Sequence, residues 1–354
     1  MALEIASLPP PPTISLCTRQ MAGLFVDVYG LDELSPAVTN VSCLWLHHPR
    51  LRDRGHMAGI AARCVDAWKA QEGRQGSGEE GKGKRGLIAL AYDQRNHGSR
   101  LVDEKANGAW REGNALHAVD MFGVIEGMVG DQKVLLDLVE GYLFPEGTRK
   151  IDQHLALGIS LGGHSVWQLM FAEPRVTAGV VVIGCPDYMY LLSDRARLSK
   201  LSTYSKDDGG ISFLGSRDFP PSLIEACKKF DPKAIFFGTS AVPDVKEGGL
   251  LDDTWRQIIR DRVRNKKFLL CSGGDDKLVP YKCSEPFLQW FKPATRSWFR
   301  EEGVSVDDRV YPGVGHSFSV DMIADSVQFV VDVVAGAGQA ASPGSVDEQR
   351  ASKI

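Results

Sequence analysis

The sequence predicts an α/β fold: a doubly wound, mostly parallel sheet of eight strands with helices on both faces. Two observations predict the sheet. Four runs in the middle and later parts of the chain are almost continuously apolar, which is typical of strands covered on both faces. Segments with helical spacing of apolar residues lie between them. A third observation, the long interval between the sixth and seventh runs, predicts an inserted segment.

Eight short runs rich in β-branched and aromatic residues are the expected strands. The first two or three have no helix between them, so they should form an antiparallel edge. The runs are Thr13–Thr18, Leu24–Tyr29, Val41–His47, Leu87–Tyr92, His154–Gly158, Ala178–Gly184, Lys267–Cys271 and Asp308–Tyr311.

Helices are expected where apolar residues recur every three or four positions. One apolar stripe follows the third run, from Met57 to Trp68, and a second runs from Val134 to Tyr142. A third helix should span Leu161 to Glu173 and end before Pro174. A last stripe, from Ile323 to Val334, closes the pattern.

The interval between the sixth and seventh runs defines the expected domain organisation. Residues 187–265 are too long for one crossover and contain leucines and phenylalanines without strong strand signals, so a helical cap is expected there. Residues 1–186 and 266–335 would form the core. Residues 336–354, rich in Gly, Ala and Ser, are expected to be a disordered tail. Gln71 to Arg85 should form a surface loop.

Composition excludes several classes of function. The net charge of −4 implies no strongly basic face, so a nucleic-acid partner is not expected. No apolar run reaches the ~18 residues that a membrane helix needs, and residues 1–12 lack the pattern of a secretory signal. The seven cysteines are odd in number and form no C-x-x-C pair, which favours a reducing compartment. No metal site or cofactor is expected.

The last three residues bear on localisation. Ser352, Lys353 and Ile354 resemble the S-K-L type of peroxisomal signal, with isoleucine in place of leucine. A peroxisomal import receptor is therefore a candidate partner. The expected localisation is cytoplasmic or peroxisomal.

The candidate nucleophile is Ser160, in the motif Gly158-Ile159-Ser160-Leu161-Gly162. This G-x-S-x-G pattern is weak alone, but here an apolar strand runs into it and a helix leaves it. A serine at such a corner sits on a strained turn with its hydroxyl projecting above the sheet. The flanking glycines are needed because backbone segments approach closely there.

With two later motifs, this elbow resembles the α/β-hydrolase superfamily over about Thr13 to Ala335. The resemblance implies the chain order serine, acid, histidine. In the segment after the seventh run it places the acid at Asp276, with Asp275 as a close rival and Asp187 as a distant one. The segment after the eighth run places the base at His316. An imidazole can accept the serine proton near neutral pH, and an aspartate can orient it.

Acyl transfer also needs hydrogen-bond donors for the oxyanion. One should be the backbone N–H of Leu161, the residue after the nucleophile. The second should come from the loop after the third run. Pro49 has no N–H, so the donor there is expected to be Arg50, with a register uncertain by one residue.

Two further segments add detail to the resemblance. Asp93 to Arg100 is similar to a turn common in these hydrolases, in which Asp93 and Arg95 would brace the oxyanion loop. Together with the segments 110–114 and 117–121, it resembles a group of fungal serine hydrolases with esterase-like or thioesterase-like character. Substrate contacts are expected from the cap at Tyr188, Tyr190 and Trp255, although core packing explains these side chains equally well.

The leading functional prediction is hydrolysis of a carboxylic ester with a small to medium hydrophobic acyl group, through an acyl-enzyme. A hydrolase for acyl-CoA or other thioesters, possible in a peroxisome, is the first alternative. A peptidase of the prolyl-oligopeptidase type is the second alternative, and the lack of a recognisable propeller domain in this sequence counts against long-peptide substrates. A non-catalytic binding protein on the same fold is the alternative from another class.

Overall fold

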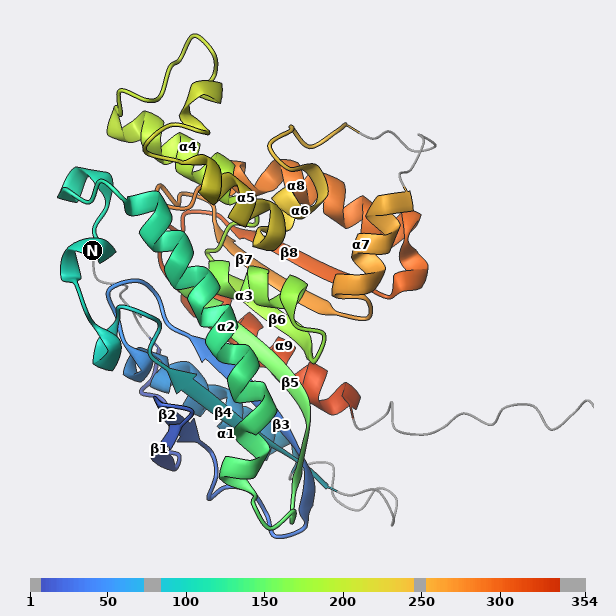
Figure 1. Ribbon diagram of the computed structural model, residues 1–354. Coiled ribbons are helices and arrows are strands. Elements are labelled where there is room, and N and C mark those ends of the chain that lie inside the picture. The colour runs from blue at the N-terminus through green and yellow to red at the C-terminus, as the bar shows by residue number, and fades with distance from the viewer. Residues whose placement is uncertain (1–7, 73–83, 245–252, 338–354) are drawn as a thin grey trace, which may run out of the picture.

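A single eight-stranded sheet, flanked by helices, organises the computed structural model, which describes residues 8–72, 84–244 and 253–337 (Figure 1). The strand order is β1-β2-β4-β3-β5-β6-β7-β8. The β1–β2 and β2–β4 pairs are antiparallel, and every other pair of neighbouring strands is parallel. The strands are β1 Leu16–Met21, β2 Leu24–Tyr29, β3 Val38–His47, β4 Lys84–Tyr92, β5 Lys150–Ile159, β6 Val176–Val182, β7 Lys267–Gly273 and β8 Ser305–Tyr311.

Helices cover both faces of the sheet (Figure 1). One face packs against α2, α3, α7 and α8 in a core cluster that includes Met128, Trp167 and Phe287. The opposite face packs against α1 and α9 through residues such as Ile60 and Val330. The helices are α1 Ala58–Glu72, α2 His117–Leu143, α3 Leu161–Ala172, α4 Tyr188–Ser199, α5 Pro221–Phe230, α6 Pro232–Phe237, α7 Asp253–Val263, α8 Tyr281–Pro293 and α9 Val320–Ala337.

The predicted fold class, a mostly parallel eight-stranded sheet with helices on both faces, is confirmed. The antiparallel edge contains only the first two strands, because β3 pairs in parallel with both β4 and β5. The first strand lies at Leu16–Met21 and not at Thr13–Thr18. Four of its six residues are exposed, so no burial pattern in the sequence marks its ends.

The segment between β6 and β7 has two differently packed parts. Helices α4 and α5 join a third cluster with the first half of α2, Leu161 and Val279, at the carboxyl end of the sheet. Helix α7 instead packs into the cluster formed by α2, α3 and α8, through Ile259 and Val263. A cap over residues 187–265 therefore stays a prediction, with α4 and α5 as the helices nearest the elbow.

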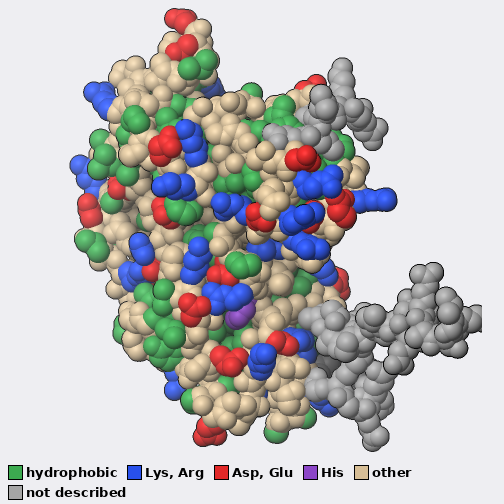
Figure 2. All heavy atoms as spheres, turned by 45° about the vertical axis from the view of Figure 1, so that its right-hand side comes forward, with side chains coloured by type: hydrophobic (Ala, Val, Ile, Leu, Met, Phe, Trp, Pro, Cys, Tyr) green, Lys and Arg blue, Asp and Glu red, His purple; other side chains and the backbone are tan. Residues whose placement is uncertain are grey.

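Charge is interspersed over the surface seen in Figure 2, where basic and acidic side chains lie next to one another. Among the described residues, no helix is long and apolar enough to cross a membrane. The terminal tripeptide Ser352–Ile354, and most of the predicted loop at 71–85 and of the tail from 336, lie outside the described residues.

Candidate active site

Ser160 occupies the corner between β5 and α3. Its backbone has φ 55° and ψ −111°, a region that L-residues rarely adopt, and its N–H donates to the carbonyl of Val182 at 2.9 Å. The glycines beside it are required by contact: a Cβ on Gly158 would lie 2.1 Å from the carbonyl oxygen of Gly162. A Cβ on Gly162 would lie 2.1 Å from the carbonyl oxygen of His47. The elbow therefore holds α3 directly against the end of β3.

Three distant segments meet at this corner. The Oγ atom of Ser160 lies 2.8 Å from Nε2 of His316, and Nδ1 of His316 lies 2.7 Å from Oδ2 of Asp276. His316 is in the loop between β8 and α9, and Asp276 is in the loop after β7. A carboxylate accepts only, so Nδ1 of His316 carries the proton and Nε2 has its lone pair toward the serine.

Asp276 is held in place as an anion. Its second oxygen, Oδ1, accepts the backbone N–H groups of Leu278 at 2.8 Å and Val279 at 2.9 Å. Burial disfavours the charged form, but the hydrogen bond from His316 and these two amides outweigh it and keep the pKa of Asp276 below its ordinary value.

The two rival acids lie elsewhere. Asp275 is exposed, and its backbone N–H donates to the carbonyl of Val314. Asp187 accepts the N–H of Tyr190 at 2.9 Å and lies 3.8 Å from Nζ of Lys233. The structure thus brings Asp276, and neither rival, to His316.

The two expected oxyanion donors lie on the segments that the elbow packs together. Leu161 is the first residue of α3, where backbone N–H groups have no partner within the helix. Arg50 is in the loop after β3, whose last residue, His47, contacts Gly162. The side chain of Arg50 donates to the carbonyl of Asn107 at 2.8 Å, which ties this loop to residues 104–107.

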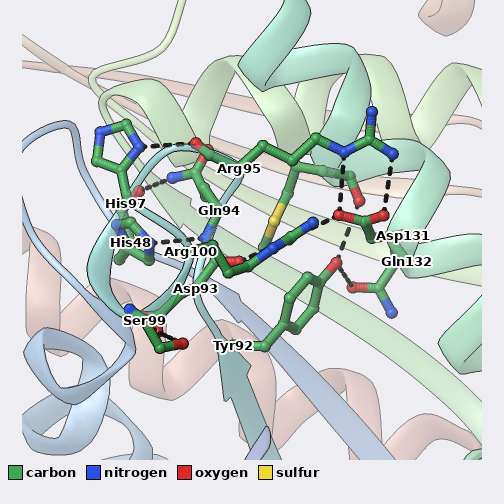
Figure 3. A network of polar contacts seen from close by, with 11 residues as sticks. His48, Tyr92, Asp93, Gln94, Arg95, His97, Ser99, Arg100, Asp131 and Gln132 are labelled. Atoms are coloured by element: carbon green, nitrogen blue, oxygen red, sulfur yellow. Dashed lines mark hydrogen bonds and ion pairs between the residues drawn. The ribbon is translucent and has the colours of Figure 1, made fainter. Parts of the chain in front are cut away.

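Gln94 and His48, which the sequence did not single out, fix the loop after β3 (Figure 3). The backbone N–H of Gln94 donates to Nε2 of His48 at 3.0 Å, and its side-chain amide donates to the carbonyl of His48. Because Nε2 accepts, Nδ1 of His48 donates to the carbonyl of Pro49. Burial lowers the pKa of His48 to about 4, so this brace is neutral at pH 7.

Asp93 and Arg95, which the sequence predicts to brace the oxyanion loop, have separate partners in the structure. Asp93 accepts hydrogen bonds from Arg54 and from both the backbone N–H and the hydroxyl of Ser99, within its own turn. Arg95 points away from the loop after β3 and pairs with Asp131 of α2 at 3.0 Å (Figure 3).

The expected substrate residues have three different surroundings. Tyr188 is buried in the third cluster, and its hydroxyl donates to the carbonyl of Ala118 at 2.7 Å. Tyr190 is 41% exposed. Trp255 packs against Phe237 and Trp290, in a different cluster from Leu161. Tyr188 therefore shares a cluster with Leu161, the residue next to Ser160, whereas Trp255 does not.

A cavity of about 240 Å³ lies close to the elbow on the α1 and α9 side. Ile159 and Phe318 line it, and the chain segment 8–11 forms part of its wall. Among the described residues, no group of three or more His, Cys, Asp or Glu side chains is placed to hold a metal ion.

Comparisons with known proteins give likeness of fold. No family model and no curated protein matches this sequence. The structure of TT1662 from Thermus thermophilus is similar with a TM-score of 0.53 and 13% identity, over 91% of this chain and 99% of that one. Est1E from Butyrivibrio proteoclasticus, with ferulic acid bound, has a TM-score of 0.43 and 14% identity, over 90% and 98% of the two chains. Pyrococcus horikoshii acylaminoacyl peptidase has 0.45 and 12%, over 93% of this chain but 42% of that one.

Proposed function

Because the chain has the α/β-hydrolase fold, we propose that it is a serine hydrolase in which Ser160 is the nucleophile, His316 the general base and Asp276 the residue that orients His316. The observation that carries this proposal is the unbroken hydrogen-bonded series from Ser160 Oγ through His316 to Asp276 Oδ2. Three segments that are distant in sequence form this series, and they meet at the carboxyl ends of the strands β5, β7 and β8.

The geometry supports acyl transfer in two steps. Ser160 Oγ attacks the substrate carbonyl carbon while Nε2 of His316 takes the hydroxyl proton, and Asp276 stabilises the imidazolium. The N–H groups of Leu161 and Arg50 would stabilise the oxyanion. The intermediate collapses with transfer of the proton to the leaving alcohol. Water, deprotonated by His316, then attacks the acyl-enzyme, releasing the acid and restoring Ser160.

The proposed substrate is a carboxylic ester with a small to medium hydrophobic acyl group. Partly buried apolar residues, among them Leu201, Ile224 and Phe230, pack against the third cluster, which contains Leu161, and they support an apolar substrate surface on this side of the nucleophile. Tyr188, Tyr190 and Trp255 stay predicted substrate contacts. A thioester substrate, with peroxisomal delivery through Ser352, Lys353 and Ile354, is the alternative within the same mechanism.

The test is hydrolysis of 4-nitrophenyl esters of increasing acyl length by the full chain, together with Ser160→Ala and Ser165→Ala. Ser165 is a matched control because it is a buried serine of α3 whose hydroxyl bonds only to the carbonyl of Leu161 at 3.2 Å. We expect turnover to fall by about 10³-fold or more in Ser160→Ala and to persist in Ser165→Ala. Turnover that survives in Ser160→Ala would remove the proposal.

A matched pair of oxygen and thio esters separates the two substrate classes. A higher kcat/KM for the thioester would move the assignment to a thioesterase. If Ser160 reacts with an active-site phosphonate but neither ester is turned over, a peptide or amide substrate would replace both.

A further inference from the structure

Arg195 connects helix α4 to the loop that holds Asp276. Its Nη2 donates to the carbonyl of Leu278 at 3.2 Å, and the N–H of Leu278 in turn donates to Asp276. Its Nη1 lies 3.0 Å from Nε2 of His117, in the first turn of α2. Figure 1 shows α4 above the start of α2. The contacts of Arg195 with His117 of α2 and Leu278 of the acid loop place its guanidinium between these two segments.

Arg50 approaches the same histidine from the opposite loop. Its guanidinium donates to the carbonyl of Asn107, and the carbonyl of the next residue, Gly108, accepts from Nδ1 of His117. Burial lowers the pKa of each arginine, and the charge of Arg50 lowers the pKa of Arg195 further. A cation on the expected oxyanion loop and a cation on α4, which contacts the acid loop, therefore both lie near His117.

No described carboxylate compensates these two charges with an ion pair. The acid nearest in sequence to Arg195 is Asp194, which pairs with Arg197 at 2.7 Å and Lys282 at 2.9 Å. The carboxylate whose charge acts most on Arg50 is that of Glu112, which accepts the backbone N–H of Ala109. Among the described residues, the hydrogen-bond partners of both guanidiniums are neutral carbonyl, imidazole and thioether atoms. The charge of Glu112 raises the pKa of Arg50 but does not outweigh its burial. Two partly buried cations near one histidine, neither in an ion pair with a described carboxylate, are unfavourable unless a further anion joins them.

A third donor points to the same conclusion. The indole ring of Trp110 stands 4.9 Å from the ring of His117, and its buried Nε1–H has no hydrogen-bond partner among the described residues. Burial and the two arginines lower the pKa of His117 to about 3, so this ring is neutral at pH 7. Because Arg195 donates to Nε2 of His117, the ring proton is on Nδ1 and is donated to the carbonyl of Gly108. The groups left to bind a ligand here are therefore all donors.

We propose that Arg50, Arg195 and the indole N–H of Trp110 bind a carboxylate carried by the substrate, at a position removed from the scissile bond. Guanidinium groups recognise planar oxyanions through paired hydrogen bonds, and a flanking indole N–H adds a third donor. This rests on the proposed hydrolase function and narrows its substrate class to esters that bear a free acid. A phosphate ester offers the same chemistry, so the test includes phosphate.

The experiment compares two aryl esters of equal carbon count. The 4-nitrophenyl monoester of adipate ends in a carboxylate, and the hexanoate ester ends in a methyl group. We expect wild-type protein to prefer the adipate ester, and Arg195→Gln to lower kcat/KM for it by about 10- to 100-fold. The hexanoate ester should change by less than about threefold, and Arg195→Lys should recover part of the loss.

Arg197→Gln is the matched control, because it removes the same charge from the same helix at a residue that pairs with Asp194. It should leave the adipate-to-hexanoate ratio unchanged. An equal loss on both esters in Arg195→Gln would contradict the proposal and make Arg195 a support for the acid loop. So would a wild-type protein with no preference between them.

Inhibition by added anions distinguishes the two oxyanions. Adipate should inhibit hexanoate hydrolysis more strongly than inorganic phosphate does, and Arg195→Gln should abolish the difference. Stronger inhibition by phosphate would overturn the carboxylate assignment. If neither ester is turned over and Ser160 is not labelled by a phosphonate, the failure belongs to the proposed function.

Discussion

Replacing Asp276 by asparagine isolates the role of its charge, because the two side chains have nearly the same shape. The amide oxygen can still accept the N–H groups of Leu278 and Val279, so the loop should keep its conformation. The amide NH2 group would then face Nδ1 of His316. That contact favours the tautomer with its proton on Nε2, which cannot accept the proton of Ser160.

The magnitude follows from the distance. Unit charges separated by the 2.7 Å between Nδ1 and Oδ2 attract by about 6 kcal/mol at an effective dielectric constant of about 20. Each 1.36 kcal/mol of lost transition-state stabilisation lowers the rate about tenfold. We therefore expect kcat in Asp276→Asn to fall by about 10⁴-fold, with little change in KM.

The matched control is Asp275→Asn, which makes the same change at an exposed neighbour whose backbone, and not its carboxylate, contacts the loop of His316. Its kcat should stay within about twofold of wild type. Both variants are assayed on one aryl ester, after thermal unfolding has established that each is folded. A large loss in Asp275→Asn, with Asp276→Asn fully active, would refute the reasoning.

Three further predictions concern stability. Gly162→Ala should abolish ester turnover and lower the melting temperature, since its Cβ would meet the carbonyl of His47 at 2.1 Å; a normally active variant would contradict the elbow geometry. Gly59→Leu should raise the free energy of unfolding by about 1 kcal/mol in denaturant titration, because a Cβ there meets open space beside the 240 Å³ cavity; a loss of stability would count against that space. The free energy of unfolding should fall by about 2 kcal/mol per buried histidine between pH 7 and pH 5, and the fall should be smaller in His154→Gln. The histidines concerned are His47, His48, His154 and His164, whose pKa in the folded protein is lowered by burial to about 4. Their pKa in the unfolded chain is ~6.5, so the unfolded chain binds more protons between pH 7 and pH 5. A stability that does not change over this pH range would contradict the lowered pKa values.

The central strands could be predicted closely because burial on both faces makes them continuously apolar, as in β7 at Lys267–Gly273. The edge strand β1 could not, since most of its side chains face solvent. Helix α2 begins at His117, well before the stripe that starts at Val134. Its first half packs against both the sheet and α4, so apolar residues surround it and no single stripe marks its start.

The same difference between local and distant information applies to the candidate site. Ser160 and His316 each lie in a short motif that selects them locally. Asp276 shares its motif with Asp275, and only the contact with His316 in the folded chain distinguishes the two. Arg195 lies in no motif, and Trp110 lies in a segment for which the sequence predicts no chemical role; only the folded chain brings both to His117. Trp255 is predicted to be a substrate contact from its place in the expected cap, and in the structure α7 carries it into the aromatic cluster around Trp290.

Covalent labelling tests the central claim most directly. The full chain is treated with a fluorophosphonate, digested, and the modified residue is located by mass spectrometry. The proposed mechanism predicts one adduct, on Ser160, which forms in Ser165→Ala, slows strongly in Asp276→Asn and is absent from Ser160→Ala. An adduct on another serine, or no adduct on protein that is demonstrably folded, would contradict the assignment of this serine as the nucleophile.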